Sequence, residues 1–389
     1  MLIHIYHQHF RYPEEGGAVR SFHLAKKLIS EGHEVLVVTA GKNKGKTEIS
    51  GIPILSFPIR YDNSFSFYRR IWSFLAFLFA ALRHACFCPK PSLNYIISSP
   101  LSTAIVGLVA KKIRSAPFLF EIGDLWPEVP IQMGIIKNPI IKRVTYWLES
   151  LALQQASHVI ALSPGIADYV SYKTDGTTSC DVIPNFSNCQ FFTPDVVERQ
   201  YTREDPFVIS YIGTIGFANH LEYLIRFAAE AEKKALPVQF YIMGDGKEKP
   251  EIKKQAAGIE SIRFKDFGNH HQVKSLLNRS QAIFLTFLNI PILHTGSPNK
   301  FFDGLAAGKL VITNLQGWIA QVCQQYECGY YYPPEDPEVG VNTLSTFIQN
   351  PVMLQAYQTN ARQLAENQFE LEMQLEKWSK LVSQPLAGL

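Results

Sequence analysis

The sequence predicts an α/β protein made of two doubly wound, Rossmann-like domains in tandem that face each other across a cleft. Three observations support this prediction. Apolar, strand-like runs alternate with segments of helical periodicity, this alternation stops and restarts near residue 200, and 389 residues are too many for one ordinary hydrophobic core. Apolar strands that alternate with helices form parallel sheets that are covered on both faces.

The first domain is expected over residues 1–195. Its predicted strands are 2–10, 33–40, 52–59, 94–99, 117–123 and 158–162. Helices are predicted at about 18–31, 65–88, 103–113 and 146–156, and another begins at Ser163. The segment 40–47 lacks the first glycine of a phosphate-binding P-loop and is interpreted as a solvated basic loop.

The second domain is expected over residues 205–365, after a polar linker at 193–206. Its predicted strands are 207–213, 238–244, 261–268, 282–287 and 309–314. Helices lie between them, the first at about 221–234. One continuous helix is predicted over 351–382, from an apolar stripe that includes Leu354, Leu375 and Trp378.

Composition excludes several classes of protein. With 47% apolar residues the chain is not intrinsically disordered, and a net charge of +3 is too small to indicate a nucleic-acid partner. The six cysteines form no C-x-x-C pair and have no histidine partners at zinc spacing. No signal peptide is recognised, so reduced thiols and a cytoplasmic location are expected.

The segment SPNKFFDGLAAGK at 297–309 is the most informative in the chain. Ser297 suits a helix N-cap and Pro298 the first helical position, and Asn299 and Lys300 then complete the first turn. Free amides, the helix dipole and a lysine form an anion site that suits a diphosphate, and Asp303 one turn later could hold a ribose diol. The alternative is a well-capped helix with a solvated lysine.

Several glycine-bearing turns directly follow predicted strands, where parallel sheets bind their ligands. Taken singly, each is more often an ordinary turn, but together they can line a nucleotide pocket. The candidate donor-binding residues in these turns are Gly16, Gly17, Gly213, Gly216, Asn219, Gly244, Gly246, Lys247 and Gly268.

The segment EIGDLWPE at 121–128 places carboxylates at another strand end. Asp124 is a candidate for acid–base work, and Glu121 and Trp126 are candidates for contact with the acceptor sugar. The alternative for this acid is a cap on the next helix. Because the chain contains no D-x-D, Lys, Arg and helix dipoles would have to neutralise a leaving diphosphate without a metal.

In this order, these motifs resemble the GT-B fold glycosyltransferases of family 4, particularly the WbuB-like subgroup of bacterial surface-polysaccharide enzymes. The resemblance implies a UDP-sugar donor in the second domain and an acceptor in the first, with no metal and with retention of anomeric configuration. It further implies that the last helix, 366–389, packs back on the first domain. For this subgroup the acceptor is usually a polyprenyl-diphosphate-linked saccharide at the inner face of the membrane.

The sequence departs from the family pattern at three places. Thr295 stands where the first of two family glutamates would contact the donor sugar, and Gly123 replaces the usual active-site histidine. The Arg/Lys pair expected after 213–216 is also absent. Phosphate neutralisation is then expected from Lys300 and its helix, together with Arg20 across the cleft.

The stretch 66–87 is rich in aromatic and basic residues, and residues 60–120 contain eight basic residues against the single acid Asp62. Its uninterrupted apolar run, 71–82, is shorter than the roughly 20 residues that span a bilayer. We interpret it as an interfacial helix on anionic lipid, with Phe74, Leu78 and Arg83 in contact with the membrane. A core helix is the alternative.

The leading hypothesis is a retaining, metal-independent transferase that moves a hexose or N-acetylhexosamine from a UDP-sugar to a lipid-linked saccharide. It would act in bacterial O-antigen or capsule biosynthesis, on the cytoplasmic face of the inner membrane. The base could also be guanine. The other hypotheses are a UDP-sugar epimerase or hydrolase of the same fold, and a non-catalytic sugar-binding subunit of a polysaccharide assembly complex.

Overall fold

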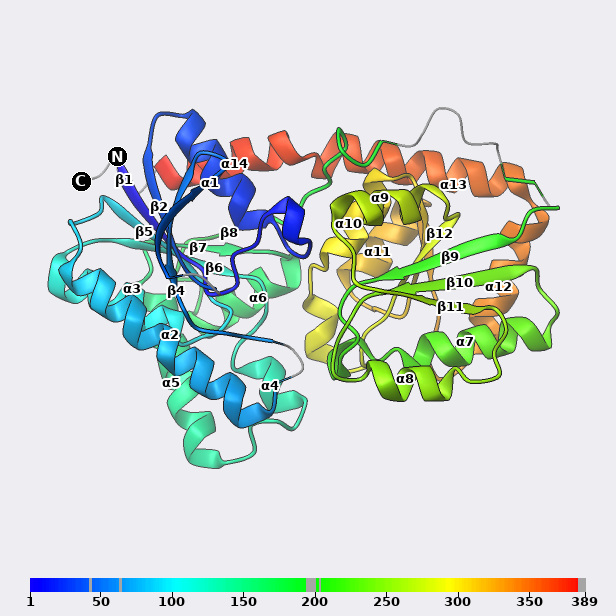
Figure 1. Ribbon diagram of the computed structural model, residues 1–389, viewed down its shortest axis with the longest axis horizontal. Coiled ribbons are helices and arrows are strands. Elements are labelled where there is room, and N and C mark those ends of the chain that lie inside the picture. Colours follow the sequence, from blue (N-terminus) through cyan, green and yellow to red (C-terminus); the bar gives the residue numbers. More distant parts are fainter. Residues whose placement is uncertain (42–43, 63–64, 194–200, 203, 384–389) are drawn as a thin grey trace.

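The computed structural model describes residues 1–41, 44–62, 65–193, 201–202 and 204–383. These residues form two α/β domains that lie side by side, each built on one sheet (Figure 1). The fold class predicted from the sequence is therefore confirmed. Most of the predicted linker at 193–206 lies outside the described residues.

The first domain contains an eight-stranded sheet in the order β3-β4-β2-β1-β5-β6-β7-β8. Only the pair β3 and β4 is antiparallel. Its strands are β1 (Leu2–Tyr6), β2 (Glu34–Ala40), β3 (Gly45–Ile49), β4 (Ile52–Phe57), β5 (Leu93–Ile97), β6 (Phe118–Ile122), β7 (His158–Ala161) and β8 (Cys180–Val182).

Strand β3 corrects the interpretation of 40–47 as a basic loop. It pairs with β4 through a two-residue turn at Ser50 and Gly51, both of which have positive φ. Such a turn matches the twist of a hairpin, so the polar strand adds to the sheet edge without an apolar signal of its own. A second correction concerns β1, which ends at Tyr6 rather than at residue 10.

Helices cover both faces of this sheet. The helices α2 (Phe67–Phe87), α3 (Thr103–Arg114), α5 (Pro139–Gln155) and α6 (Pro164–Lys173) contribute to the core of one face, and α1 (Arg20–Ser30) covers the other. The short α4 (Glu128–Gln132) follows β6. Helix α5 begins seven residues earlier than predicted, because Asn138 caps its amides and Pro139 occupies its first position.

The second domain contains a wholly parallel sheet in the order β11-β10-β9-β12-β13-β14. Its strands are β9 (Phe207–Ile212), β10 (Val238–Met243), β11 (Ile262–Lys265), β12 (Ala282–Leu285), β13 (Leu310–Thr313) and β14 (Gly329–Tyr331). The helices are α7 (Glu222–Lys233), α8 (Lys249–Gln255), α9 (His270–Asn278), α10 (Asn299–Ala306), α11 (Trp318–Gln325), α12 (Pro337–Gln349) and α13 (Pro351–Leu364).

The predicted continuous helix at 351–382 is wrong. Helix α13 runs into a π-helical turn, Ala365–Phe369, and Glu370 then takes an extended conformation before α14 (Leu371–Ser383) begins. The segment around Ser187 is the other place where the polypeptide crosses between the domains, and it lies beside this break. The Ser187 amide donates to the Phe369 carbonyl, and the Leu371 amide donates to the Ser187 carbonyl. The extended residue redirects the chain, so that α14 crosses back and packs on α1 of the first domain, as expected (Figure 1).

Candidate active site

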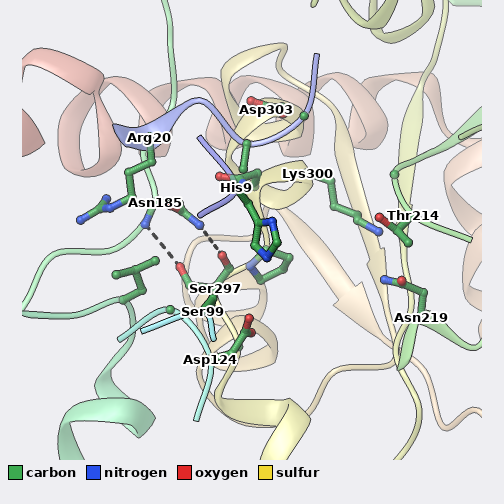
Figure 2. Close-up of a pocket in the computed structure, with 18 of the residues that line it drawn as sticks. His9, Arg20, Ser99, Asp124, Asn185, Thr214, Asn219, Ser297, Lys300 and Asp303 are labelled. Carbon is green, nitrogen blue, oxygen red and sulfur yellow. Dashed lines mark hydrogen bonds between the residues drawn. The ribbon is translucent and has the colours of Figure 1, made fainter. Parts of the chain in front are cut away.

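A cavity of about 540 Å³ lies between the two domains, at the carboxyl ends of their central strands. Thirteen of the candidate site residues line it: Gly16, Gly17, Arg20, Glu121, Asp124, Gly213, Asn219, Gly268, Ser297, Pro298, Asn299, Lys300 and Asp303. Figure 2 shows residues from both domains around this space. Because the strands of each sheet run parallel, the loops at their carboxyl ends lie together even where they are far apart in the sequence.

Lys300 is the principal cation of the second-domain wall. Its Nζ donates to Tyr211 Oη at 3.0 Å and lies 4.1 Å from the centre of that ring. Burial lowers the pKa of Lys300 to about 7, and no ion pair to it is found in the described parts of the chain. In Figure 2 the side chain extends toward Thr214 and Asn219. A lysine without a carboxylate partner in a cavity suits an anionic ligand.

Asp303 lies one turn further along α10 and also lines the cavity. Burial raises the pKa of its carboxyl to about 7. A carboxyl in this environment gains stability when a ligand donates hydrogen bonds to it, as the vicinal hydroxyls of a ribose can.

The helix itself begins differently from the prediction. Its first residue is Asn299, Pro298 is the N-cap, and the Ser297 side chain makes no capping bond. Instead Ser297 Oγ accepts from the Asn185 amide at 3.3 Å, and Ser297 carbonyl oxygen accepts from Asn185 Nδ2 at 2.6 Å (Figure 2). Ser297 therefore joins the domains, while the uncapped first turn leaves its amides available to a ligand.

Asp124 stands on the opposite, first-domain wall, in the loop after β6. It is open to the cavity but surrounded by protein, and burial raises the pKa of its carboxyl. Trp126, two residues later, does not line the cavity, which corrects its assignment to the acceptor side. Its ring packs edge-on against Phe74, with 6.2 Å between ring centres, because the chain has already turned toward the helix layer.

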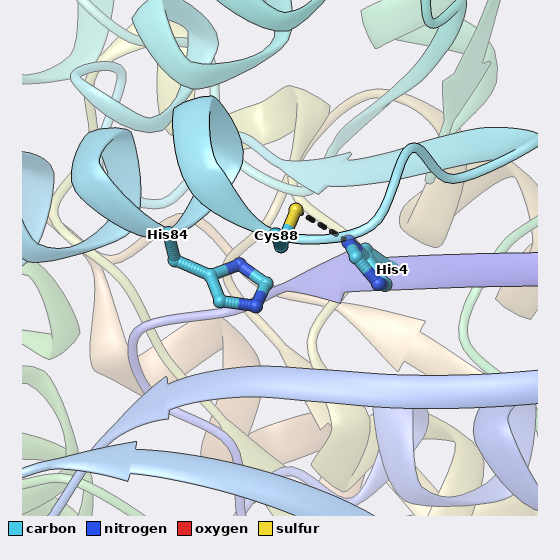
Figure 3. Close-up of side chains that lie close together, drawn as sticks. All are labelled: His4, His84 and Cys88. Carbon is cyan, nitrogen blue, oxygen red and sulfur yellow. Dashed lines mark hydrogen bonds between the residues drawn. The ribbon is translucent and has the colours of Figure 1, made fainter.

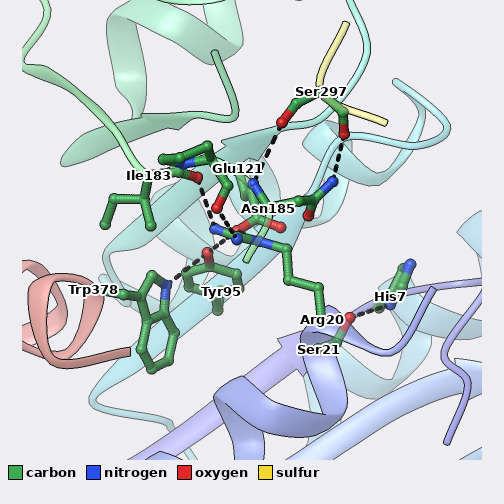
Figure 4. Close-up of polar contacts among 10 residues, drawn as sticks. His7, Arg20, Ser21, Tyr95, Glu121, Ile183, Asn185, Ser297 and Trp378 are labelled. Carbon is green, nitrogen blue, oxygen red and sulfur yellow. Dashed lines mark hydrogen bonds and ion pairs between the residues drawn. The ribbon is translucent and has the colours of Figure 1, made fainter. Parts of the chain in front are cut away.

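Arg20 and Glu121 both line the cavity, and they also bind each other (Figure 4). Arg20 Nε donates to Glu121 Oε2 at 2.9 Å, and its two terminal nitrogens donate to the carbonyls of Pro184 and Ile183. Tyr95 Oη also donates to Glu121, and Trp378 of α14 donates to Tyr95 Oη at 2.8 Å. Each guanidinium nitrogen makes one hydrogen bond and both partners are buried, so this network ties α14 to the first domain and orients Arg20 at the cavity wall.

Four predicted donor-binding residues, Gly216, Gly244, Gly246 and Lys247, lie outside the cavity lining. Gly244 is glycine for packing reasons: a Cβ there would lie 1.9 Å from the Gly213 carbonyl oxygen. Gly246 has φ +154°, and its Cβ would lie 2.2 Å from the Ile215 carbonyl oxygen. These two glycines support the Gly213 loop from behind, while Lys247 is exposed.

The structure also shows the surroundings of Thr295, one of the positions at which the sequence departs from the family pattern. Thr295 lines the cavity, but its hydroxyl donates to the Ile292 carbonyl at 2.7 Å.

The cavity wall also contains residues that were not predicted from the sequence, including His7, His9, Ser99, Thr214 and His270. The strand-end signal could have found His7 and His9, but the strand predicted over 2–10 concealed them. Burial lowers the pKa of His7 to about 3 and of His9 to about 4, so both rings are neutral.

Both halves of the chain match known protein families. Residues 15–185 match the glycosyl transferase 4-like domain, and residues 195–364 match the glycosyl transferases group 1 domain. The α-D-kanosaminyltransferase of Streptomyces kanamyceticus is 25% identical over 160 residues, which cover 39% of this chain and 40% of that enzyme. The alignment thus spans less than half the length of that relative.

Two solved structures share the whole fold. Sucrose-phosphate synthase from Thermosynechococcus elongatus superposes with a TM-score of 0.78 at 16% identity and covers 100% of both chains. Alr3699/HepE from Anabaena, solved with UDP-glucose, gives a TM-score of 0.72 at 17% identity, with 99% of this chain and 100% of that chain covered. With both domain models matched in order along one two-domain chain, the protein belongs to the GT-B glycosyltransferases of the family 4 type.

Proposed function

We propose that the protein is a retaining, metal-independent transferase that moves a hexose or N-acetylhexosamine from a UDP-sugar to a lipid-linked saccharide. The observation that carries this proposal is the interdomain cavity, in which Lys300 and Asp303 of one domain face the space shared with Asp124 of the other. The choice of UDP is supported by the UDP-glucose complex of Alr3699/HepE.

On the donor side, the roles follow from charge. The diphosphate would lie at the first turn of α10, where Lys300 Nζ and the free amides meet the negative charge that grows as the sugar–phosphate bond breaks. Asp303 would accept hydrogen bonds from the ribose hydroxyls. A bound diphosphate would raise the pKa of Lys300 again, because it supplies the anionic partner that the buried lysine lacks.

On the acceptor side, Asp124 lines the cavity and would take a proton from the attacking hydroxyl. Its raised pKa brings the carboxyl closer to neutral pH, where a general base is most effective. Retention of configuration is part of the proposal because the sequence resembles retaining family 4 enzymes. Metal independence is supported by a lysine and a helix N-terminus at the phosphate position, in a chain without D-x-D.

Membrane contact is the third part of the proposal, and α2 supports it. Tyr68, Trp72 and Phe79 are 83%, 72% and 68% exposed and lie along one side of the helix. On its other side Phe77, Leu78, Ala81 and Ala85 are buried in the core. Exposed aromatics beside Arg69 and Arg83 are typical of a helix that lies at the headgroup level of anionic lipid.

Two earlier expectations about α2 need correction. Leu78 is buried and Phe74 stacks on Tyr61 at 5.5 Å, so neither belongs to the proposed lipid-facing side. Residues Tyr68–Phe87 form the one helix of the described chain that is long and apolar enough to cross a membrane, with a mean hydropathy of 1.3 over an 18-residue window. The packing of one side of this helix into the core favours an interfacial position over a spanning one.

The helix layer that contains α2 exposes further apolar groups. Helix α5, on the other side of α3, exposes Ile140, Val144 and Trp147 together with Arg143. The cytoplasmic face of the inner membrane and a role in bacterial O-antigen or capsule biosynthesis are part of the proposal because the sequence resembles the WbuB-like subgroup. The acceptor would be a polyprenyl-diphosphate-linked saccharide of the kind used by the WbuB-like subgroup.

The transfer reaction is tested with purified protein and a panel of nucleotide-sugars. A donor that binds the folded state raises the melting temperature, so thermal shift selects the base and sugar. Release of UDP that depends on added membrane extract supports transfer. Equal release from donor alone would favour the epimerase or hydrolase, and binding without any release would favour a sugar-binding subunit.

Membrane contact is tested separately by co-sedimentation with vesicles that contain anionic lipid. The double variant Trp72→Ser/Phe79→Ser should lose most binding, because it removes two exposed aromatic anchors and leaves the core untouched. Tyr172→Ser, which alters an aromatic residue that is 82% exposed on α6, is the matched control. If both variants sediment like the wild type, α2 is not the membrane contact.

A further inference from the structure

Three side chains with metal-ligating atoms meet beside the sheet of the first domain, away from the active-site cavity (Figure 3). His4 belongs to β1, while His84 lies in the last turn of α2 and Cys88 is its C-cap. Their ligand atoms all lie within 4.8 Å of one another, and Cys88 Sγ is 3.8 Å from His4 Nδ1. None of the three lines the cavity between the domains.

The neighbours of the cluster resemble the outer shell of a metal site. Tyr6 Oη lies 3.1 Å from His84 Nδ1 and is itself wholly buried. This contact orients the imidazole ring, as hydrogen bonds beyond the ligand shell usually do for histidine ligands. His4 is only 2% exposed, so its ring is held by the packing of β1 against α2.

The distances fit a tetrahedral ion. Zinc bonds of about 2.3 Å to sulfur and about 2.05 Å to nitrogen place S and N about 3.6 Å apart. The observed Sγ–Nδ1 distance of 3.8 Å is close to this value. The remaining distances, at most 4.8 Å, would need to shorten by about 1.4 Å at most. His84 and Cys88 are half-buried, which leaves their side chains room to move and gives an ion a route from solvent.

We propose that His4, His84 and Cys88 bind one divalent ion of the zinc class, with water as the fourth ligand. Two imidazole nitrogens and one thiolate form a borderline-soft set that favours Zn²⁺ over Mg²⁺ or Ca²⁺. On binding, Cys88 forms the metal–sulfur bond and its thiol proton passes to solvent. The ion would cross-link the end of α2 to β1, and it has no part in sugar transfer.

Sequence spacing explains why this cluster is easily overlooked. His84 and Cys88 are four residues apart, one turn on the same side of α2, whereas His4 is 84 positions from Cys88. Only the pairing of β1 within the sheet, beneath α2, brings the third ligand to the other two. The lack of histidine partners at zinc spacing in the sequence therefore does not exclude a histidine contact in the fold, since Cys88 Sγ lies 3.8 Å from His4 Nδ1.

The test uses the full-length protein after treatment with a chelator. Titration with Co²⁺ should give one equivalent of binding with a thiolate-to-cobalt charge-transfer band in the near ultraviolet, and Zn²⁺ should displace it. Cys88→Ser should lose the band and about 100-fold or more in Zn²⁺ affinity. Cys86→Ser, two residues away and outside the cluster, should bind like the wild type.

The melting temperature distinguishes a loss of metal binding from a loss of folding. Zn²⁺ should raise the melting temperature of the wild type and of Cys86→Ser, but not of His84→Gln, because only a bound ion stabilises the folded state by mass action. If the wild type gives no charge-transfer band, or if Cys88→Ser and His84→Gln bind Zn²⁺ as tightly as the wild type, the site does not exist.

Discussion

Replacing Lys300 with methionine should weaken UDP binding severely while leaving the fold intact. Methionine is apolar and of similar length, so it can fill the space beside the Tyr211 and Phe287 rings, over which Lys300 Nζ lies at 4.1 and 5.4 Å from the ring centres. Tyr211 Oη remains satisfied in the variant, since it also donates to the Thr214 carbonyl at 2.6 Å. The substitution therefore removes the charge without leaving an unpaired buried hydroxyl.

The magnitude follows from the bond that is lost. A hydrogen bond between an ammonium and a phosphate oxygen contributes about 1.5–3 kcal/mol, which corresponds to UDP binding that is weaker by about 10- to 140-fold. Stability should not fall, because the wild type buries a lysine whose pKa drops to about 7 and so disfavours the protonated form in the folded state. The free variant should melt at the same temperature or higher.

Isothermal calorimetry with UDP at pH 7 measures the first effect, and thermal unfolding without ligand measures the second. Lys247→Met is the matched control, because that lysine is exposed in the same domain but outside the cavity. The reasoning is refuted if Lys300→Met binds UDP like the wild type, if Lys247→Met loses as much affinity, or if Lys300→Met melts well below the wild type.

Three further predictions concern pH, a buried ion pair and a glycine. Between pH 7 and 9, UDP affinity measured by calorimetry should fall about tenfold per pH unit, because Lys300 loses its proton above a pKa of about 7, whereas Lys300→Arg should show no such fall. The unfolded chain keeps that proton up to an ordinary pKa of 10.5, so the stability contributed by this group rises over the same range, and an unchanged wild-type affinity would contradict the assignment. Arg20→Met should lower the free energy of unfolding in urea by about 3–5 kcal/mol, because Glu121 stays buried without its partner; a loss like that of the exposed control Lys26→Met would show that the network is unimportant. Gly244→Ala should lower it by about 1–3 kcal/mol through the clash with Gly213, whereas Gly216→Ala, whose nearest neighbour would lie at 3.4 Å, should cost much less; equal losses in the two would argue against the packing explanation.

Much of the architecture could be read from local patterns. The apolar runs of β1, β9 and β10 and the helical spacing of α1 and α7 specify buried strands and amphipathic helices regardless of distant partners. The polar strand β3 and the break at Glu370 could not be predicted in this way. Each depends on a partner elsewhere, β4 for the strand and Ser187 for the break.

In the candidate site too, local patterns predicted some features, whereas others depend on distant partners. Lys300, Asp303 and Asp124 were predicted because each follows a strand or begins a helix, and chain direction alone brings such positions to the edge of a parallel sheet. The sequence does not show whether a side chain at that edge is free to bind a ligand. Arg20 reaches the cavity wall, but its guanidinium also donates to Glu121 and to two carbonyls, and Ser297 Oγ accepts a hydrogen bond from the Asn185 backbone amide.

By itself, the sequence determined that this protein has two Rossmann-like domains and that the loops after their strands gather at one edge of each sheet, because periodicity and strand direction are local properties. Tertiary structure decided which polar groups remain available, which face of α2 is exposed, and that His4 meets His84 and Cys88. These outcomes depend on hydrogen bonds and packing between residues that are far apart in the chain, and no local pattern encodes such partners.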